Sequence, residues 1–327
     1  MDGDSNQRGE CFFIETLALY LLMASFMASL LPLGTCSGNK TPFQEFSSYL
    51  LSIGVPGHEI QFLLDAGSSR SANTKHVFAR DLKMVLMSHW HLDHTRWIGT
   101  LVRNLADRGR KEPLPILCNS KTKFFLELLI RLKNKFLVPP FVLFSIDSLP
   151  RRRRGFQHLN GETPNRRYVF HLGTSNHCIL TIKTRYAYHS KDGLAYRLNF
   201  HLSGNDGTGS RHLSVVYSPD THYNSTHLTK FAMNADYWLL DTTYNDDLLL
   251  ENIDKYGGLL THSSATRSAL LCKAARVKHY IAGHYFWKRY GSTPARARCS
   301  IERAASNIFD GTVIAPRDLH EIPLHFS

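Results

Sequence analysis

One hexapeptide concentrates side chains that bind metal ions well, and it reads His89-Trp-His-Leu-Asp-His94. It directly follows the apolar run 84–87, which predicts a buried strand. A strand that ends in a tight turn presents His89 and His91 together, while Asp93 and His94 follow where the chain enters a helix. Imidazole and carboxylate suit Zn²⁺, and Mn²⁺ or Fe can substitute. Histidines also cluster on surfaces by chance, but this spacing behind an apolar run favours a site that grips two metal ions.

Further motifs, taken with the hexapeptide, resemble the metallo-β-lactamase superfamily from about residue 27 to the segment at 284. The motif Phe62-Leu-Leu-Asp-Ala-Gly67 is similar to the strand and turn that precede the histidine motif, in which Asp65 supports the metal loop. His189 matches the isolated histidine of the third motif, Asp220 the bridging carboxylate and His284 the last ligand. The motifs follow one another in the order that the superfamily shows.

The resemblance implies a dinuclear zinc site. Its ligands are expected to be His89, His91, Asp93, His94, His189, Asp220 and His284. The family pattern implies that the two histidines at 89 and 91 share one zinc with His189, that Asp93, His94 and His284 hold the other, and that Asp220 bridges. Two adjacent cations need a shared anion to offset their repulsion, and a water between them is acidified.

Motifs after residue 220 resemble the ribonuclease Z branch, the tRNA 3′-processing endonucleases. These motifs are Leu239-Leu-Asp-Thr-Thr-Tyr244 and Thr261-His-Ser-Ser-Ala-Thr266. Because a phosphodiester needs its leaving oxygen protonated, His262, oriented by Asp241, is the expected general acid. Asp93 is expected to orient or deprotonate the attacking water in addition to binding metal. In the competing interpretation, His262 only helps to cap the helix that follows it.

The resemblance implies hydrolysis of RNA phosphodiesters, with precursor tRNA as the substrate. A class II-like cyclic-nucleotide phosphodiesterase is the alternative, because those enzymes share the H-x-H-L-D-H spelling and need no tRNA-gripping arm. The short interval between His189 and Asp220 leaves little room for such an arm. A catalytically silent scaffold is a third hypothesis, which the full ligand set disfavours. Relatives often dimerise, so a homodimer is also open.

Short apolar runs bounded by turn residues predict the strands that position these groups. Several end in His or Asp, and they span 46–53, 61–65, 84–89, 182–189, 195–202, 213–220, 237–243 and 279–284. Helices are predicted within 124–135 and within 261–278, where hydroxyl residues stand at a capping position. These elements suit a layered α/β protein, and the resemblance implies an α/β, four-layer αββα sandwich. Two mixed sheets lie face to face, helices cover the outside, and the metal site lies at one sheet edge.

Composition supports a folded, basic protein. The chain has 327 residues, 43% of them hydrophobic and 20% charged, which excludes wholesale disorder. Its 39 Lys+Arg against 27 Asp+Glu give a formal charge of +12, which favours polyanionic partners. Four consecutive arginines, residues 151–154, lie in a predicted basic loop near 149–168. They either contact RNA or form ordinary solvated surface.

The sequence predicts two parts, an N-terminal apolar extension over 1–26 and a hydrolase domain over 27–327. The uncharged run 16–32 is short for a membrane span, and Asp2, Asp4 and Glu10 ahead of it are unlike the basic start of a secretory signal. An extra helix is expected, with a signal or anchor left open and a cytoplasmic location favoured. The six cysteines form no C-x-x-C pair, which indicates ordinary thiols rather than a zinc knuckle.

Overall fold

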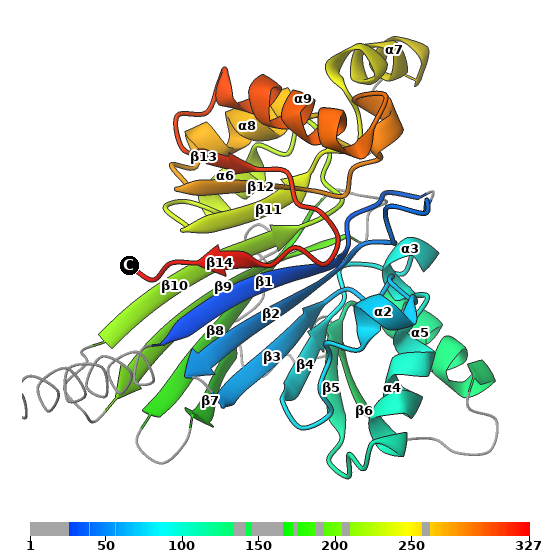
Figure 1. Cartoon of the computed structure of the whole chain (residues 1–327), viewed down its shortest axis with the longest axis vertical. Helices are drawn as coiled ribbons and strands as arrows, with labels where there is room; N and C mark the ends of the chain where they lie inside the picture. The colour runs from blue at the N-terminus through cyan, green and yellow to red at the C-terminus, as the bar shows by residue number, and fades with distance from the viewer. Residues whose placement is uncertain are drawn as a thin grey trace, which may run out of the picture.

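The computed structural model describes residues 26–38, 40–55, 57–133, 141–145, 166–172, 176–187, 193–204, 210–256 and 262–327. Within these ranges the chain forms two seven-stranded sheets that lie face to face, with helices on their outer sides (Figure 1). This arrangement confirms the predicted four-layer αββα sandwich. Among the described helices, none is long and apolar enough to cross a membrane.

The first sheet has the strand order β14-β1-β2-β3-β4-β5-β6. Its strands are β1 (Met27–Gly34), β2 (Ser48–Val55), β3 (His58–Leu64), β4 (Leu82–Leu86), β5 (Leu114–Cys118), β6 (Phe141–Ser145) and β14 (Ile322–Leu324). The pairs from β14 to β3 are antiparallel and those from β3 to β6 are parallel. The carboxyl ends of β3, β4 and β5 therefore meet at one edge of the sheet.

The second sheet has the order β13-β12-β11-β10-β9-β8-β7. Its strands are β7 (Arg166–Leu172), β8 (Asn176–Tyr186), β9 (Leu194–Gly204), β10 (Ser210–Ser218), β11 (Tyr237–Asp241), β12 (His279–Gly283) and β13 (Thr312–Ile314). Strands β7 to β10 pair antiparallel, and β10 to β13 pair parallel. The parallel half again brings successive carboxyl ends to one edge.

Helices cover the outer sides of both sheets. Beside the first sheet lie α2 (Ser71–Thr74), α3 (Leu92–Thr95), α4 (Ile98–Asp107) and α5 (Ser120–Lys133). At the parallel half of the second sheet lie α6 (His227–Phe231), α7 (Asp246–Tyr256), α8 (Ala265–Ala274), the 3-10 turn η1 (Trp287–Arg289) and α9 (Pro294–Ser306). Ser264 caps α8 by accepting a hydrogen bond from the Arg267 amide, which confirms the predicted hydroxyl cap.

Three buried clusters match the three interfaces of a four-layer structure. The largest fills the space between the sheets, with Phe62 and Leu64 from one sheet and Phe200 and Tyr217 from the other. A second packs α4 and α5 on the first sheet, and a third packs α6, α8 and α9 on the second. Strands covered on both faces, such as β2, are therefore buried along nearly their whole length.

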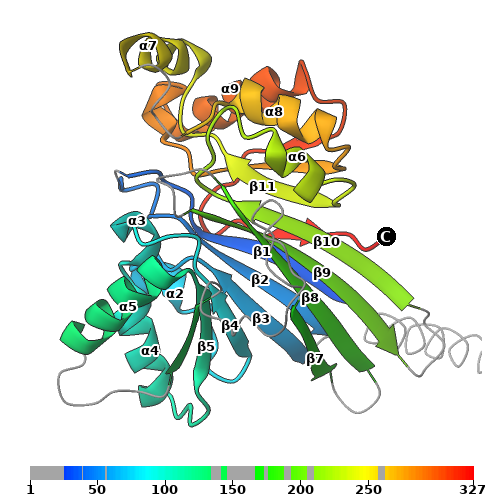
Figure 2. The ribbon, with the colours of Figure 1, turned by 180° about the vertical axis from the view of Figure 1, so that it is seen from behind.

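Strand β9 instead alternates between the two environments. Leu198, Phe200 and Leu202 face the space between the sheets, whereas Asn199 and His201 between them are half-exposed. The antiparallel half of the second sheet, β7 to β10, extends away from the helices α6 and α8 (Figure 2). This part of the sheet therefore has one apolar face and one polar face, as is typical of antiparallel sheets.

Strand β1 begins at Met27, the residue at which the hydrolase domain was expected to start, and Ala28 and Leu30 pack between the sheets. Residues 1–25 lie outside the described part of the chain, so the two-part division stays a prediction. The basic loop was expected to reach residue 168, but 166–168 pair with β8 as the start of β7. Residues 146–165, with the arginine run, lie outside the described ranges.

Tyr196 joins the two sheets at the edge where the carboxyl ends meet. The side chain is fully buried, and its hydroxyl lies 2.7 Å from the Met87 carbonyl and 3.0 Å from the Leu117 carbonyl. It therefore fastens β9 to the ends of β4 and β5, immediately before the histidine hexapeptide.

Replacing Tyr196→Phe should lower the free energy of unfolding by about 1–3 kcal/mol, because a buried carbonyl loses its donor. Urea denaturation followed by circular dichroism measures the loss. Tyr256→Phe, which removes the hydroxyl of an exposed tyrosine in α7, is the matched control and should change little. Equal stability of the two variants would contradict this role of Tyr196.

Candidate metal centre

The candidate site lies where the carboxyl ends of both sheets meet. The hexapeptide follows β4, and its second half forms the short helix α3, which carries Asp93 and His94. From the second sheet, Asp220 follows β10 and His284 follows β12. His284 has a backbone φ of 52°, an uncommon left-handed conformation, as the chain turns away from the strand. Residues far apart in the sequence thus reach one place.

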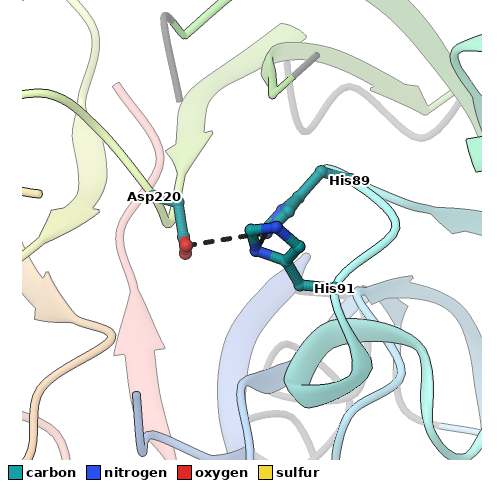
Figure 3. A group of neighbouring side chains, drawn as sticks. All are labelled: His89, His91 and Asp220. Atoms are coloured by element: carbon teal, nitrogen blue, oxygen red, sulfur yellow. Dashed lines mark hydrogen bonds and ion pairs between the residues drawn. The ribbon is translucent and has the colours of Figure 1, made fainter. Parts of the chain in front are cut away.

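One group of donor atoms consists of His89, His91 and Asp220 (Figure 3). The Nε2 of His89 lies 3.6 Å from Oδ2 of Asp220 and 2.8 Å from Nδ1 of His91. Figure 3 shows the carboxylate at the end of β10 facing the two rings of the hexapeptide. Three ligand atoms of suitable type therefore converge from two sheets.

A second group consists of Asp93, His94 and His284. The Nε2 atoms of His94 and His284 are 3.1 Å apart, and Oδ2 of Asp93 lies 3.4 Å from Nε2 of His284. The Oδ1 of Asp220 lies 3.1 Å from Nε2 of His94 and 3.2 Å from that of His284. Because its Oδ2 faces His89, the Asp220 carboxylate stands between both groups, as a bridging ligand must.

Hydrogen bonds hold the far sides of the His89 and His284 rings. The Nδ1 of His89 lies 2.9 Å from the Ser88 hydroxyl, and the Nδ1 of His284 lies 3.0 Å from the Thr243 hydroxyl. Both hydroxyls donate onward, to Asp65 and to the His284 carbonyl, so each can accept the Nδ1 proton. In that tautomer the Nε2 lone pairs face the centre, the state that metal ligation requires.

The Asp65 carboxylate is hydrogen-bonded to the hexapeptide and to the residue before it. It accepts from the Ser88 amide and hydroxyl, each at 2.6 Å, and from the Tyr217 hydroxyl at 2.6 Å. Its Oδ2 is also 2.7 Å from Nδ1 of His94. The carboxylate is fully buried, so these donors must stabilise its charge. Asp65 thereby fixes the orientation of His94 without reaching the donor cluster itself.

Charge in the cluster shifts the pKa values of its members strongly. Burial raises the pKa of Asp93, but the His94 and His284 imidazoles more than offset this effect, so the pKa is lowered. Burial lowers the pKa of His94, yet Asp220, Asp93 and Asp65 outweigh burial and raise it. Such closely packed carboxylates attract cations. With imidazole nitrogens and carboxylate oxygens within 4.8 Å of one another in each group, the donor set fits divalent metal ions of the zinc type.

Beside the cluster, His262 pairs with the buried Asp241. Its Nδ1 lies 2.7 Å from Oδ2 of Asp241 and 4.0 Å from Oδ2 of Asp220. Two further donors, the amides of Thr221 and Thr243, hold the Asp241 carboxylate in place. Burial lowers the pKa of His262, but the Asp241 carboxylate outweighs it and the pKa is raised. The ring stacks on His284 with 5.4 Å between ring centres, so an imidazole whose Nδ1 is held by a carboxylate stands at the cluster.

Of the residues predicted from the sequence, the structure brings together His89, His91, Asp93, His94, Asp220, Asp241, His262 and His284. His189 lies outside the described residues. Sequence reasoning missed the supporting hydroxyls of Ser88, Tyr217 and Thr243. All three stand within or next to the motifs that were singled out, and position was the one available signal, because hydroxyl residues are too common to stand out.

A group of aromatic and basic residues, called the rim here, comprises Phe43, Trp287, Lys288 and Arg289. The last three closely follow His284, and Arg289 donates to the carbonyl of Thr243 beside the cluster at 3.0 Å. Phe43 is 62% exposed and its ring lies 6.4 Å from that of Trp287, edge to face. The Nζ of Lys288 lies 5.8 Å from the Trp287 ring centre. The Phe43 loop reaches the site itself, since the Gly38 amide donates to Oδ2 of Asp93 at 3.0 Å.

Comparison with known sequences finds ribonuclease Z proteins. Over 255 residues the chain is 25% identical to ribonuclease Z of Ignicoccus hospitalis, covering 71% of this chain and 82% of that protein. Over 85 residues it is 29% identical to ribonuclease Z of Clostridium tetani, a match that covers 26% of this chain and only 27% of that protein. No protein-family model matches the chain.

Comparison with solved structures finds the same architecture. The metallo-β-lactamase fold protein YhfI from Bacillus subtilis superposes with a TM-score of 0.60 at 19% identity, covering 91% of this chain and 99% of that one. The short form of human tRNase Z superposes with a TM-score of 0.59 at 15% identity, covering 91% and 99%. The chain therefore has the metallo-β-lactamase fold, and its sequence is similar to that of ribonuclease Z.

Proposed function

We propose that this chain is a metal-dependent phosphodiesterase that cleaves RNA, with a dinuclear zinc site and precursor tRNA as its substrate. The observation that carries the proposal is the Asp241–His262 pair beside a cluster of metal-binding donors. A hydrolase that only had to activate water would not need an imidazole paired with a buried carboxylate beside its metal-binding residues. The similarity to ribonuclease Z supports RNA as the substrate class.

The chain offers two groups of ligands for the metal ions. His89, His91 and Asp220 would hold one ion, and Asp93, His94 and His284 the other, with Asp220 shared. His189 stays the predicted further ligand of the first ion. Zinc ions bound there would supply an acidified water and offset the negative charge of the phosphate.

The residues around the metals would complete the reaction. His262 would donate its Nε2 proton to the leaving oxygen, while Asp241 holds the Nδ1 proton and fixes the ring. Asp93 would orient the attacking water, and the Gly38 amide keeps one of its oxygens in place. Asp93 thus combines metal binding with water orientation, whereas leaving-group protonation belongs to His262 alone and can be removed separately.

Asp220→Ala should lose bound metal and activity together, because it removes the carboxylate shared by both groups. His262→Ala should keep its metal and lose about 10²-fold or more in kcat on RNA. Metal analysis and turnover on the same samples measure both effects. His58→Ala, at the far end of β3, is the control and should keep both properties.

The leaving group provides a sharper test of His262. A nitrophenyl phosphodiester releases a stable anion that needs no proton, so His262→Ala should lose much less turnover on it than on RNA. Equal losses on both substrates, or metal loss in His262→Ala, would make His262 a structural residue.

A panel of precursor tRNA, single-stranded RNA, cyclic AMP and cyclic GMP tests the substrate class. Cleavage of precursor tRNA by the purified chain with two zinc ions bound is the expected result. Efficient hydrolysis of a cyclic nucleotide without cleavage of any RNA would replace the proposal by the cyclic-nucleotide alternative. Light scattering on the same preparation shows whether the chain forms the homodimer that the sequence leaves open.

The rim residue Phe43 should contact an unpaired base of the substrate, because stacking on an exposed aromatic ring is worth about 1–3 kcal/mol per base. Phe43→Ala should raise KM for RNA by roughly tenfold and leave kcat on a nitrophenyl phosphodiester unchanged. Phe78→Ala is the matched control, since Phe78 is 52% exposed but lies beside the start of β4, at the opposite end of the sheet. An unchanged KM for RNA in Phe43→Ala would show that Phe43 does not contact the RNA substrate.

A further inference from the structure

Four histidines lie on the polar outer face of the second sheet, away from the metal cluster. They stand on four successive strands: His171 on β7, His177 on β8, His201 on β9 and His212 on β10. Their neighbours along the strands, such as Cys178, Phe200 and Leu213, are buried between the sheets, so the histidines point outward. None of them contributes to the proposed catalytic reaction.

The pairing register brings the four histidines close together. His171 is directly opposite His177, and His201 is directly opposite His212. His177 is opposite Ser203, two residues from His201 and on the same face. Directly opposite residues in antiparallel strands have Cβ atoms about 5 Å apart, so the imidazoles form a continuous group across four strands.

The His201 and His212 rings have the spacing of two ligands on one ion. The Nδ1 of His201 lies 3.3 Å from Nδ1 of His212 and 3.3 Å from its Nε2, with 4.5 Å between the ring centres. Two nitrogens that each bind a tetrahedral zinc at about 2.0–2.1 Å are themselves about 3.3 Å apart. A small rotation of either ring would turn two lone pairs toward a shared ion.

We infer that His201 and His212 form a second, separate binding site for a divalent transition-metal ion of the zinc type. Burial, His212, His177 and Arg167 all lower the pKa of His201, which favours the neutral ring that ligation requires. His177 is on the same face, but its Nε2 is 2.6 Å from the Ser203 hydroxyl and it is not counted as a ligand. Arg167 opposes a cation, so the affinity should be micromolar rather than nanomolar.

The site is independent of the catalytic cluster. His212 and Asp220 are at opposite ends of β10, which places them on the order of 20 Å apart along the strand. An ion bound by His201 and His212 would cross-link β9 and β10 at the end far from the reaction. It would stabilise this half of the sheet without taking part in catalysis.

Equilibrium dialysis of the purified full chain against Zn²⁺ tests the site. At about 10 µM free Zn²⁺, the wild type should bind one ion per chain more than His201→Gln or His212→Gln, whatever the occupancy of the catalytic cluster. The double variant should lose no more than either single variant, because one ion is shared. His177→Gln, outside the ligand pair, and His58→Gln, an exposed histidine on β3, should leave this ion bound.

Two further measurements separate this site from misfolding and from the proposed function. Turnover of a nitrophenyl phosphodiester, if the chain has it, and far-ultraviolet circular dichroism should be the same in both glutamine variants and the wild type. Zn²⁺ should raise the Tm of the wild type more than that of the variants. Equal Zn²⁺ binding by the wild type and the variants, or additive losses in the double variant, would overturn the inference and leave an ordinary contact between surface histidines.

Discussion

The carboxylate of Asp65 is the constraint on which the site depends, because a charge buried this completely is tolerated only when donors surround it. The donors come from the hexapeptide segment, through Ser88 and His94, and from the opposite sheet, through Tyr217. Satisfying one buried charge therefore fixes the hexapeptide and locks it to β10. The backbone of Asp65 also has a positive φ of 57°, which is an uncommon left-handed conformation for a residue other than glycine.

The parallel halves of the two sheets explain why so few residues suffice to build the cluster. Strands β10, β11 and β12 are parallel neighbours, so the residues that end or follow them, Asp220, Asp241 and His284, meet at one edge although long stretches of sequence separate them. The hexapeptide arrives from the matching edge of the first sheet. Face-to-face packing of the sheets then closes the site, and the fully buried Tyr196 fastens that contact.

The resemblance to the metallo-β-lactamase superfamily, together with apolar runs that end in His or Asp, was sufficient to predict the sandwich and the donor cluster. In this fold several donors directly follow buried strands, so they leave a pattern in adjacent residues. Strands β5, β6, β7, β13 and β14 were not predicted. Prolines stand within or directly before β5 and β6, β7 follows an arginine-rich stretch, and β13 and β14 are very short. Long-range partners such as Tyr217 with Asp65 left no pattern, because nothing in either segment specifies the other.

Histidine side chains have two different surroundings in this fold, one at the catalytic edge and one on the outer face of the second sheet. The difference follows from what covers each sheet face. At the catalytic edge, His94 lies between layers and a buried carboxylate holds its second nitrogen, so ring orientation is fixed before any ion arrives. On the outer face, His201 is half-exposed and faces another imidazole across the strand pair. Its ring must lose rotational freedom when it binds. Preorganisation, more than the number of imidazoles, should therefore set the order of affinity between the two sites.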